Sequence, residues 1–112
     1  MLIYKIFRPE EWQILVDHGQ TQVSPIDVTD GYIHFSTYDQ VRETAAKHFA
    51  NAGDLILVAC DSDAMKPDMK WEVSRGGALF PHLYRVMRME DVIWHKPLPQ
   101  RDAGHIFPED MS

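Results

Sequence analysis

Alternating apolar and polar positions at the start of the chain predict a β-strand, and a helical spacing follows it. The segment LIYKIF, residues 2–7, places its even-numbered side chains on one face and its odd-numbered side chains on the other. After this strand, Pro9 is typical of a first helical position, and Gly19 is typical of the residue that follows a helix ending near His18. The apolar stripe of this helix consists of Trp12, Leu15 and Val16.

A second strand is predicted over residues 32–36, YIHFS, after a segment at residues 24–31 that we interpret as a loop. A period of two residues places Ile33 and Phe35 on one face of this strand, which we expect to be turned toward the core. The opposite face then presents a polar row made of Tyr32, His34 and Ser36.

The clearest helical pattern covers about residues 38–51. Thr37 is a suitable cap because Gln40 follows it three positions later, and Gly53 is a suitable stop. One face of this helix gathers Val41, Ala45, His48 and Phe49.

The remaining strands are short and are not separated by regularly spaced helices. The near-continuous apolar run at residues 55–60, LILVAC, is typical of a strand in the centre of a sheet. Further strands are expected at residues 69–73, 84–88 and 91–95. Because helices and strands do not alternate strictly, the pattern predicts an α+β fold with a split, mostly antiparallel sheet. We expect six side chains to be largely buried: Trp12, Ile33, Phe35, Phe49, Leu55 and Leu57.

We expect a single domain over residues 1–96 and an irregular C-terminal tail over residues 97–112. The tail contains several prolines and has no apolar period, so no regular element is predicted there. The part of the tail from about Gln100 onward is expected to contribute little to a binding cleft.

The segment WEVSRGGALFPHLY, residues 71–84, combines reactive side chains with apolar ones. Arg75, Gly76, Gly77 and Pro81 argue against regular structure, whereas the aromatic residues around them are too apolar for a plain solvent loop. We interpret the segment as an ordered loop that shapes a pocket. It is predicted to fold back over the strand that bears His34, so that Glu72, Arg75 and His82 converge on His34 and Ser36.

Charge and composition narrow the classes of function. The net charge of −6 opposes nonspecific binding of nucleic acid, although one local basic cluster would still suffice for a small anionic ligand. The longest uncharged apolar run is far shorter than a membrane span, and no signal peptide is recognised at the N-terminus. The single cysteine, Cys60, is expected to be a buried, reduced thiol, consistent with a cytoplasmic protein.

The six histidines show none of the paired spacings of common metal sites, so we predict no metal centre. Gly76-Gly77 is not followed by the lysine of a phosphate-binding loop. What remains is the combination of DGYIHFST at residues 30–37 with the segment 71–84. Polar groups on a strand are often only hydrogen-bonded, so a structural role for His34 and for a Glu72–Arg75 pair stays open.

The order DGYIHFST, helix, DLILVACD and WEVSRGGALFPHLY resembles the bacterial family named domain of unknown function 952, over about residues 2–95. That family is similar in fold to the ADP-ribosyltransferases, which have a split sheet and a nicotinamide-dinucleotide cleft. The RNA 2′-phosphotransferases are the branch that looks most alike, through the pattern of His34 and Ser36 before a helix.

The resemblance implies roles for particular residues. ADP-ribosyl transfer passes through an oxocarbenium-like transition state, in which a histidine and a hydroxyl can hold the ribose and a carboxylate can stabilise the cation. His34 and Glu72 are then the expected catalytic residues. The expected ligand-binding residues are Tyr4, Ser36, Arg75, Gly76, Gly77 and His82, with Arg75 and the two glycines on the pyrophosphate.

Two departures limit what the resemblance implies. The chain has neither a basic cluster for a 2′-phosphate nor a lobe for RNA, so removal of an RNA phosphate is rejected. Two functions stay open: an enzyme that takes NAD or a related ribosyl compound as substrate without a tightly bound cofactor, or a non-catalytic nucleotide-binding or interaction module. In a third, purely structural interpretation, both motifs are core and turn residues.

Overall fold

The computed structural model describes residues 1–102 and 104–112, and for Arg75 it describes the backbone but not the side chain. Helices and antiparallel strands form one α+β domain, as the sequence predicts. The helices are α1 (Pro9–His18), α2 (Pro25–Asp30) and α3 (Tyr38–His48). Two short strand pairs, β2 (Gln20–Thr21) with β7 (Met87–Arg88) and β9 (Gln100–Arg101) with β10 (Gly104–His105), accompany two larger sheets.

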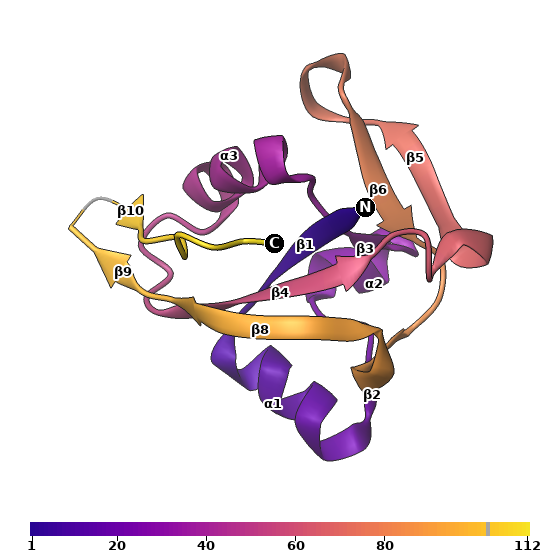
Figure 1. Ribbon diagram of the computed structural model, residues 1–112, viewed down its shortest axis with the longest axis horizontal. Helices are drawn as coiled ribbons and strands as arrows, with labels where there is room; N and C mark the ends of the chain where they lie inside the picture. Colours follow the sequence, from indigo (N-terminus) through magenta and orange to yellow (C-terminus); the bar gives the residue numbers. More distant parts are fainter. Residues whose placement is uncertain (103) are drawn as a thin grey trace.

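The first sheet contains β1 (Leu2–Phe7), β4 (Leu55–Asp61) and β8 (Val92–Leu98), in the order β1-β4-β8 (Figure 1). Both pairings are antiparallel, and β4 lies in the centre, as its continuous apolar sequence predicts. In Figure 1, α3 lies above this sheet and α1 below it.

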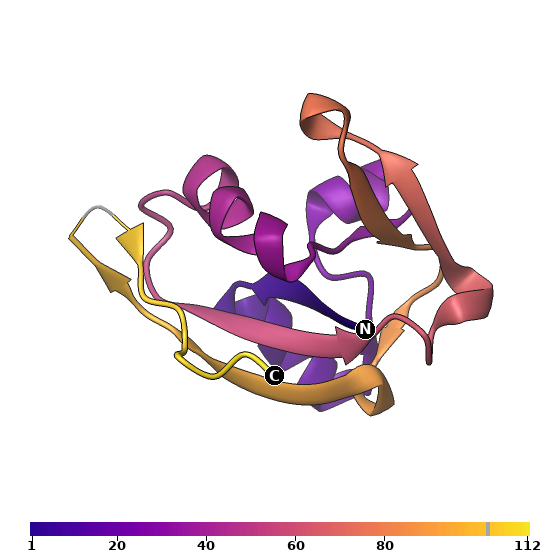
Figure 2. The ribbon, with the colours of Figure 1, turned by 45° about the horizontal axis from the view of Figure 1, so that its top comes forward.

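The second sheet contains β3 (Ile33–His34), β6 (Leu79–Leu83) and β5 (Met69–Val73), in the order β3-β6-β5. Its β5–β6 hairpin rises away from the first sheet in both views (Figures 1 and 2). A bridge between Tyr4 and Ser36 connects the two sheets, with N–O distances of 2.8 and 2.9 Å. The bridge brings the polar row of the second sheet against the first strand of the chain.

Each face of the first sheet has its own hydrophobic core, because β1 buries both its odd-numbered and its even-numbered side chains. Ile3 and Phe7 pack with Leu15 of α1 on one face, and Tyr4 and Ile6 pack with α3 on the other. Four of the six side chains expected in the core are buried, namely Ile33, Phe35, Leu55 and Leu57. Trp12 and Phe49 are half-buried and pack against the two cores.

Three local predictions about the helices are wrong. Residues 24–31 are not a loop, because Ser24 caps α2, Asp27 bonds back to the Ser24 N–H, and Gly31 ends the helix in the left-handed region. The helix predicted over residues 38–51 ends at His48. Val16 is exposed, since the narrow buried stripe of α1 is centred on Leu15.

The prediction of an irregular loop at residues 71–84 is also wrong. This segment is a β-hairpin whose tip is a turn at Arg75–Gly77, where Gly76 and Gly77 have φ of 65° and 81°. Glycine adopts this left-handed region without steric cost, so the two glycines close the hairpin and do not interrupt it. Pro81 sits within β6 and contributes its carbonyl, which accepts the Phe35 N–H at 2.9 Å where β3 has already ended.

The C-terminal segment, for which no regular element was expected over residues 97–112, contains short strands up to His105 and no helix or strand over residues 106–112. β8 extends to Leu98, and the β9–β10 pair follows it. Met111 is buried in the core of the α3 face, and its carbonyl accepts a hydrogen bond from the Tyr4 hydroxyl at 2.6 Å. Further bonds from Trp94 to the Ser112 carbonyl and from Lys96 to the Asp110 carbonyl attach the segment along β8 (Figure 1).

Replacing Met111 by alanine should therefore lower the free energy of unfolding by about 2–3 kcal/mol, because a buried methionine side chain is lost and a cavity remains. The matched control is Ile106→Ala in the same segment, since Ile106 is 54% exposed and should change stability by less than about 0.5 kcal/mol. Urea unfolding followed by circular dichroism measures both. Equal effects of the two variants would contradict the docking of Met111.

Candidate functional site

A cleft of about 980 Å³ has His34 and Ser36 of the predicted polar row in its lining. Its lining comes from both three-stranded sheets and from α1, α2 and α3, so residues distant in sequence meet there. The polar and charged lining residues include Lys5, Arg8, Asp30, His34, Ser36 and His82. Apolar side chains such as Ile14, Phe35, Phe49 and Phe80 complete the wall.

The cleft gathers some of the residues predicted from the sequence but not all of them. Tyr4, His34, Ser36 and His82 line it. Glu72 is not among the lining residues, but its carboxylate contacts Nδ1 of His82. Gly76 and Gly77 lie at the hairpin tip and are not among the lining residues. The side chain of Arg75 lies outside the part of the chain that the structure describes. The predicted convergence on His34 is thus seen for His82 and, through it, for Glu72.

His34 is held by Asp27, a buried residue on α2. Asp27 Oδ1 lies 2.6 Å from His34 Nδ1 and accepts the His34 backbone N–H at 3.0 Å. Ser24 donates its hydroxyl to the other carboxylate oxygen at 2.6 Å. Because an ionised carboxylate only accepts hydrogen bonds, Nδ1 of His34 carries a proton in this contact.

Lys5 completes this network from β1, where its Nζ is 3.0 Å from Asp27 Oδ2. Burial alone would raise the pKa of Asp27, but the hydrogen bond from His34, the charge of Lys5 and the bond from Ser24 outweigh it and leave that pKa below its ordinary value. Burial also lowers the pKa of Lys5, an effect that Asp27 opposes. The pair is a buried ion pair at the cleft, because Lys5 is among the lining residues and Asp27 holds His34, which also lines it.

A second carboxylate, that of Asp30, faces the other ring nitrogen of His34. Asp30 Oδ2 lies 2.9 Å from His34 Nε2, and both side chains are about one-third exposed. Both ring nitrogens of His34 therefore have an acidic partner, one buried and one in the lining of the cleft.

His82 forms a separate unit with Glu72 across the β5–β6 hairpin. Glu72 Oε1 is 2.8 Å from His82 Nδ1 and accepts the Tyr84 hydroxyl at 2.7 Å. These bonds from Tyr84 and His82 lower the pKa of Glu72, and the same contact raises the pKa of Tyr84 to about 12. Glu72 is therefore an ionised acceptor near neutral pH.

The ring of Tyr32 links the two histidines. It stacks on His82 with a centroid distance of 4.2 Å and lies 4.7 Å from the ring of His34. The two imidazoles are themselves 5.3 Å apart, nearly perpendicular. This packing fixes the ring planes, so both histidines keep a defined orientation toward the cleft.

The hydroxyl groups of two predicted ligand-binding residues already have partners. The Tyr4 hydroxyl donates to the Met111 carbonyl, and Ser36 Oγ lies 2.9 Å from Thr44 Oγ1. Tyr4 therefore presents its ring rather than a free hydroxyl donor.

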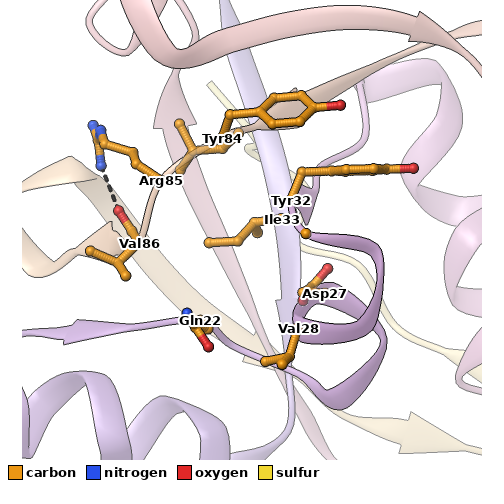
Figure 3. Close-up of a pocket in the computed structure, with 10 residues that line it drawn as sticks. Gln22, Asp27, Val28, Tyr32, Ile33, Tyr84, Arg85 and Val86 are labelled. Atoms are coloured by element: carbon orange, nitrogen blue, oxygen red, sulfur yellow. Dashed lines mark hydrogen bonds between the residues drawn. The ribbon is translucent and has the colours of Figure 1, made fainter.

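A smaller pocket of about 290 Å³ lies beside this site (Figure 3). In Figure 3 the rings of Tyr32 and Tyr84 point to the same side, and Arg85 points away from them. The charge of Arg85 is neutralised by two bonds to Asp91, at 2.8 and 2.9 Å, and by Asp68. This pocket contains neither His34 nor His82, so the larger cleft is the better candidate site.

Sequence reasoning missed Lys5, Asp27 and Asp30. Asp27 has a recognisable signal, because the spacing from Ser24 with Pro25 between them is typical of a capped helix start. Lys5 interrupts an otherwise apolar face between Ile3 and Phe7, which indicates a buried partner.

Neither a metal centre nor a membrane span is found in the part of the chain that the structure describes. No group of three or more His, Cys, Asp or Glu side chains there could hold a metal ion. Likewise, no helix among these residues is long and apolar enough to cross a bilayer.

The model of the family described as protein of unknown function (DUF952) matches residues 6–95. The chain belongs to this family. The crystal structure of protein CC0527 from Caulobacter crescentus is similar at 41% identity and a TM-score of 0.90, covering 94% of this chain and 92% of that one. The solution structure of CC0527 is similar at 41% identity and a TM-score of 0.82, covering 93% and 90%. A search of the curated proteins found no match.

Replacing Asp27 by asparagine should lower the free energy of unfolding by about 3 kcal/mol, because Lys5 is left as an uncompensated buried charge. The pKa of Asp27 is lower in the folded protein than the unfolded value of 3.8, so its stabilisation is present above that pH and is lost as the pH falls below it. Asp27→Asn should therefore weaken the acid dependence of stability.

Urea unfolding between pH 2.5 and pH 7 measures both effects. The double variant Lys5→Met with Asp27→Asn should be less destabilised than the sum of the two single changes, since neither charge is then left alone. Additive effects would show that Lys5 and Asp27 do not act as a pair.

Proposed function

We propose that the cleft binds a small ribosyl nucleotide such as NAD or ADP-ribose. The observation that supports this most is that Tyr4, His34, Ser36 and His82 line one cleft. An imidazole and a hydroxyl are suited to hold ribose oxygens, and aromatic rings are suited to a planar base.

The size and lining of the cleft agree with such a ligand. Its volume of about 980 Å³ is at the upper end of the range of ligand pockets, roughly 300–1,000 Å³. Phe49 and Ile14 offer an apolar surface for a base. Arg8 is the lining cation whose side chain is 39% exposed, whereas Lys5 is paired with Asp27.

The proposed reaction is ADP-ribosyl transfer or a related cleavage at the ribose. The proposed fold is similar to that of the ADP-ribosyltransferases, and the proposed location is the cytoplasm. His34 would contact the ribose, and a carboxylate would favour the oxocarbenium-like transition state. Glu72 is not in the lining, which favours a second candidate, a nucleotide-binding module without catalysis. Nucleotide binding is common to both candidates and is therefore the property to test first.

Thermal-shift measurements with NAD, ADP-ribose and AMP test the binding. A nucleotide at about 100 times its Kd should add roughly 2.7 kcal/mol of stability and raise Tm by several degrees. His34→Ala should remove most of this shift while the unliganded protein stays folded.

The matched control is His95→Ala, because the His95 ring packs against Trp12 at a centroid distance of 4.4 Å and is not in the lining of the cleft. It should keep the ligand response of the wild type. If none of the three nucleotides raises Tm in the wild-type protein, the proposed ligand class is wrong.

If a nucleotide does bind, an assay for the release of nicotinamide from NAD distinguishes an enzyme from a binding module.

A further inference from the structure

The two histidines of the cleft differ in the state of their ring nitrogens. His34 has a carboxylate on each nitrogen, at 2.6 Å on Nδ1 and 2.9 Å on Nε2. His82 has a carboxylate on Nδ1 alone. Over residues 1–102 and 104–112, with the Arg75 side chain set aside, Nε2 of His82 has no hydrogen-bond partner.

Nε2 belongs to the His82 side chain, which is only 3% exposed. A buried polar atom without a partner destabilises the fold, so such atoms are rare unless something else contacts them. His82 lines the cleft, whereas Glu72, its partner on Nδ1, does not. Nε2 is therefore the nitrogen available to a molecule in the cleft.

The proton on the ring is placed by Glu72. Its carboxylate already accepts the Tyr84 hydroxyl at 2.7 Å, and an ionised carboxylate cannot donate. Nδ1 of His82 must then donate the 2.8 Å hydrogen bond, which leaves a lone pair on Nε2 when the ring is neutral.

The surroundings also favour the neutral ring. Burial lowers the pKa of His82 below its ordinary value, and the neighbouring His34 adds to this effect. Glu72 and Asp30 oppose it without reversing it. Tyr32 covers one face of the ring by stacking at 4.2 Å, which keeps water from that side.

We infer that His82 is the proton acceptor of the cleft, and that Glu72 and Tyr84 position it. This inference rests on the proposed ribosyl ligand for its chemistry. His34 is unsuited to the same task, because both of its ring nitrogens already face carboxylates. Glu72 thereby becomes a positioning residue that acts through His82, instead of the carboxylate that touches the substrate.

For an NAD-like substrate the step is a hydrolysis or a transfer to a hydroxyl. Water, or the acceptor hydroxyl, gives its proton to Nε2 of His82 while its oxygen bonds to C1′ of the ribose. The bond from C1′ to the pyridinium nitrogen breaks, and its electron pair neutralises that nitrogen. General-base assistance of this kind contributes on the order of 10²–10⁴-fold in rate.

Long-range ¹H–¹⁵N NMR of the histidine rings tests the inference without a known reaction. At pH 7.5 the His82 ring should be neutral, with the proton on Nδ1 and the lone pair on Nε2. It should take up its second proton only below pH 6.5, the ordinary value, because its pKa is lowered. A proton on Nε2 of the neutral ring, or a charged ring at pH 7.5, would overturn the inference.

Two variants of Glu72 test whether its carboxylate sets the tautomer of His82 or only packs against the ring. Glu72→Gln keeps a carbonyl acceptor for Nδ1–H but loses the charge, so the tautomer should persist and the pKa of His82 should fall further. Glu72→Leu removes the acceptor and should populate the tautomer with the proton on Nε2. An unchanged His82 spectrum in Glu72→Leu would show that Glu72 does not position the ring.

Addition of ADP-ribose distinguishes the two proposals. It should shift the Nε2 resonance of His82 and leave that of His95 unchanged. If ADP-ribose, NAD and AMP all leave the spectrum and Tm unchanged while the Nε2 lone pair is present, the proposal of a ribosyl ligand is wrong, whereas the assignment of His82 as proton acceptor stands.

If wild-type protein releases nicotinamide from NAD, His82→Gln should lower kcat about 100-fold or more. Equal kcat in wild type and His82→Gln would contradict the assigned role.

Discussion

The carboxylate of Asp27 is the point on which the geometry of the candidate site depends. It accepts hydrogen bonds from Ser24 at the start of α2, from the backbone and ring of His34, and from Lys5 of β1. A helix, a strand of the second sheet and a strand of the first sheet thus meet at one buried group. Asp30 on Nε2 and the ring of Tyr32 also contact His34, but of its partners only Asp27 binds both the ring and the backbone N–H.

Joining three elements through a buried ion pair carries a desolvation penalty. The desolvation of Lys5 and Asp27 offsets much of their mutual attraction, and a pair of well-packed apolar side chains would often be as stable. What an apolar pair cannot do is donate to or accept from an imidazole. The arrangement therefore orients His34 in the lining of the cleft, in the same way that Glu72 orients His82.

Prediction from sequence succeeded where one face of an element is buried and a short-range rule applies. The alternation in residues 2–7, the continuous apolar sequence of β4 and the Thr37–Gln40 cap belong to this group. It failed where the deciding contact is remote or where turn residues close a hairpin. Gly76-Gly77 was interpreted as a break, although two strands that pair with each other flank it.

The candidate site shows the same division. The placement of His34 and Ser36 opposite Ile33 and Phe35 follows from the period of a strand, and it was predicted. Lys5 lies 22 positions from Asp27 in the sequence, and no local pattern links them. Their pairing depends on how α2 lies against β1, which is a property of the tertiary fold. Met111 docks on Tyr4 for the same kind of reason, across 107 positions.

The bridge between Tyr4 and Ser36 has a mechanical consequence. Two hydrogen bonds join the sheets there, at 2.8 and 2.9 Å, and both residues also line the cleft. A hydrogen bond of this kind is lost when it is stretched beyond about 3.5 Å, so the cleft cannot widen gradually at this bridge. Ligands of different widths must then be accommodated by movement of other lining elements, such as α1 and β6.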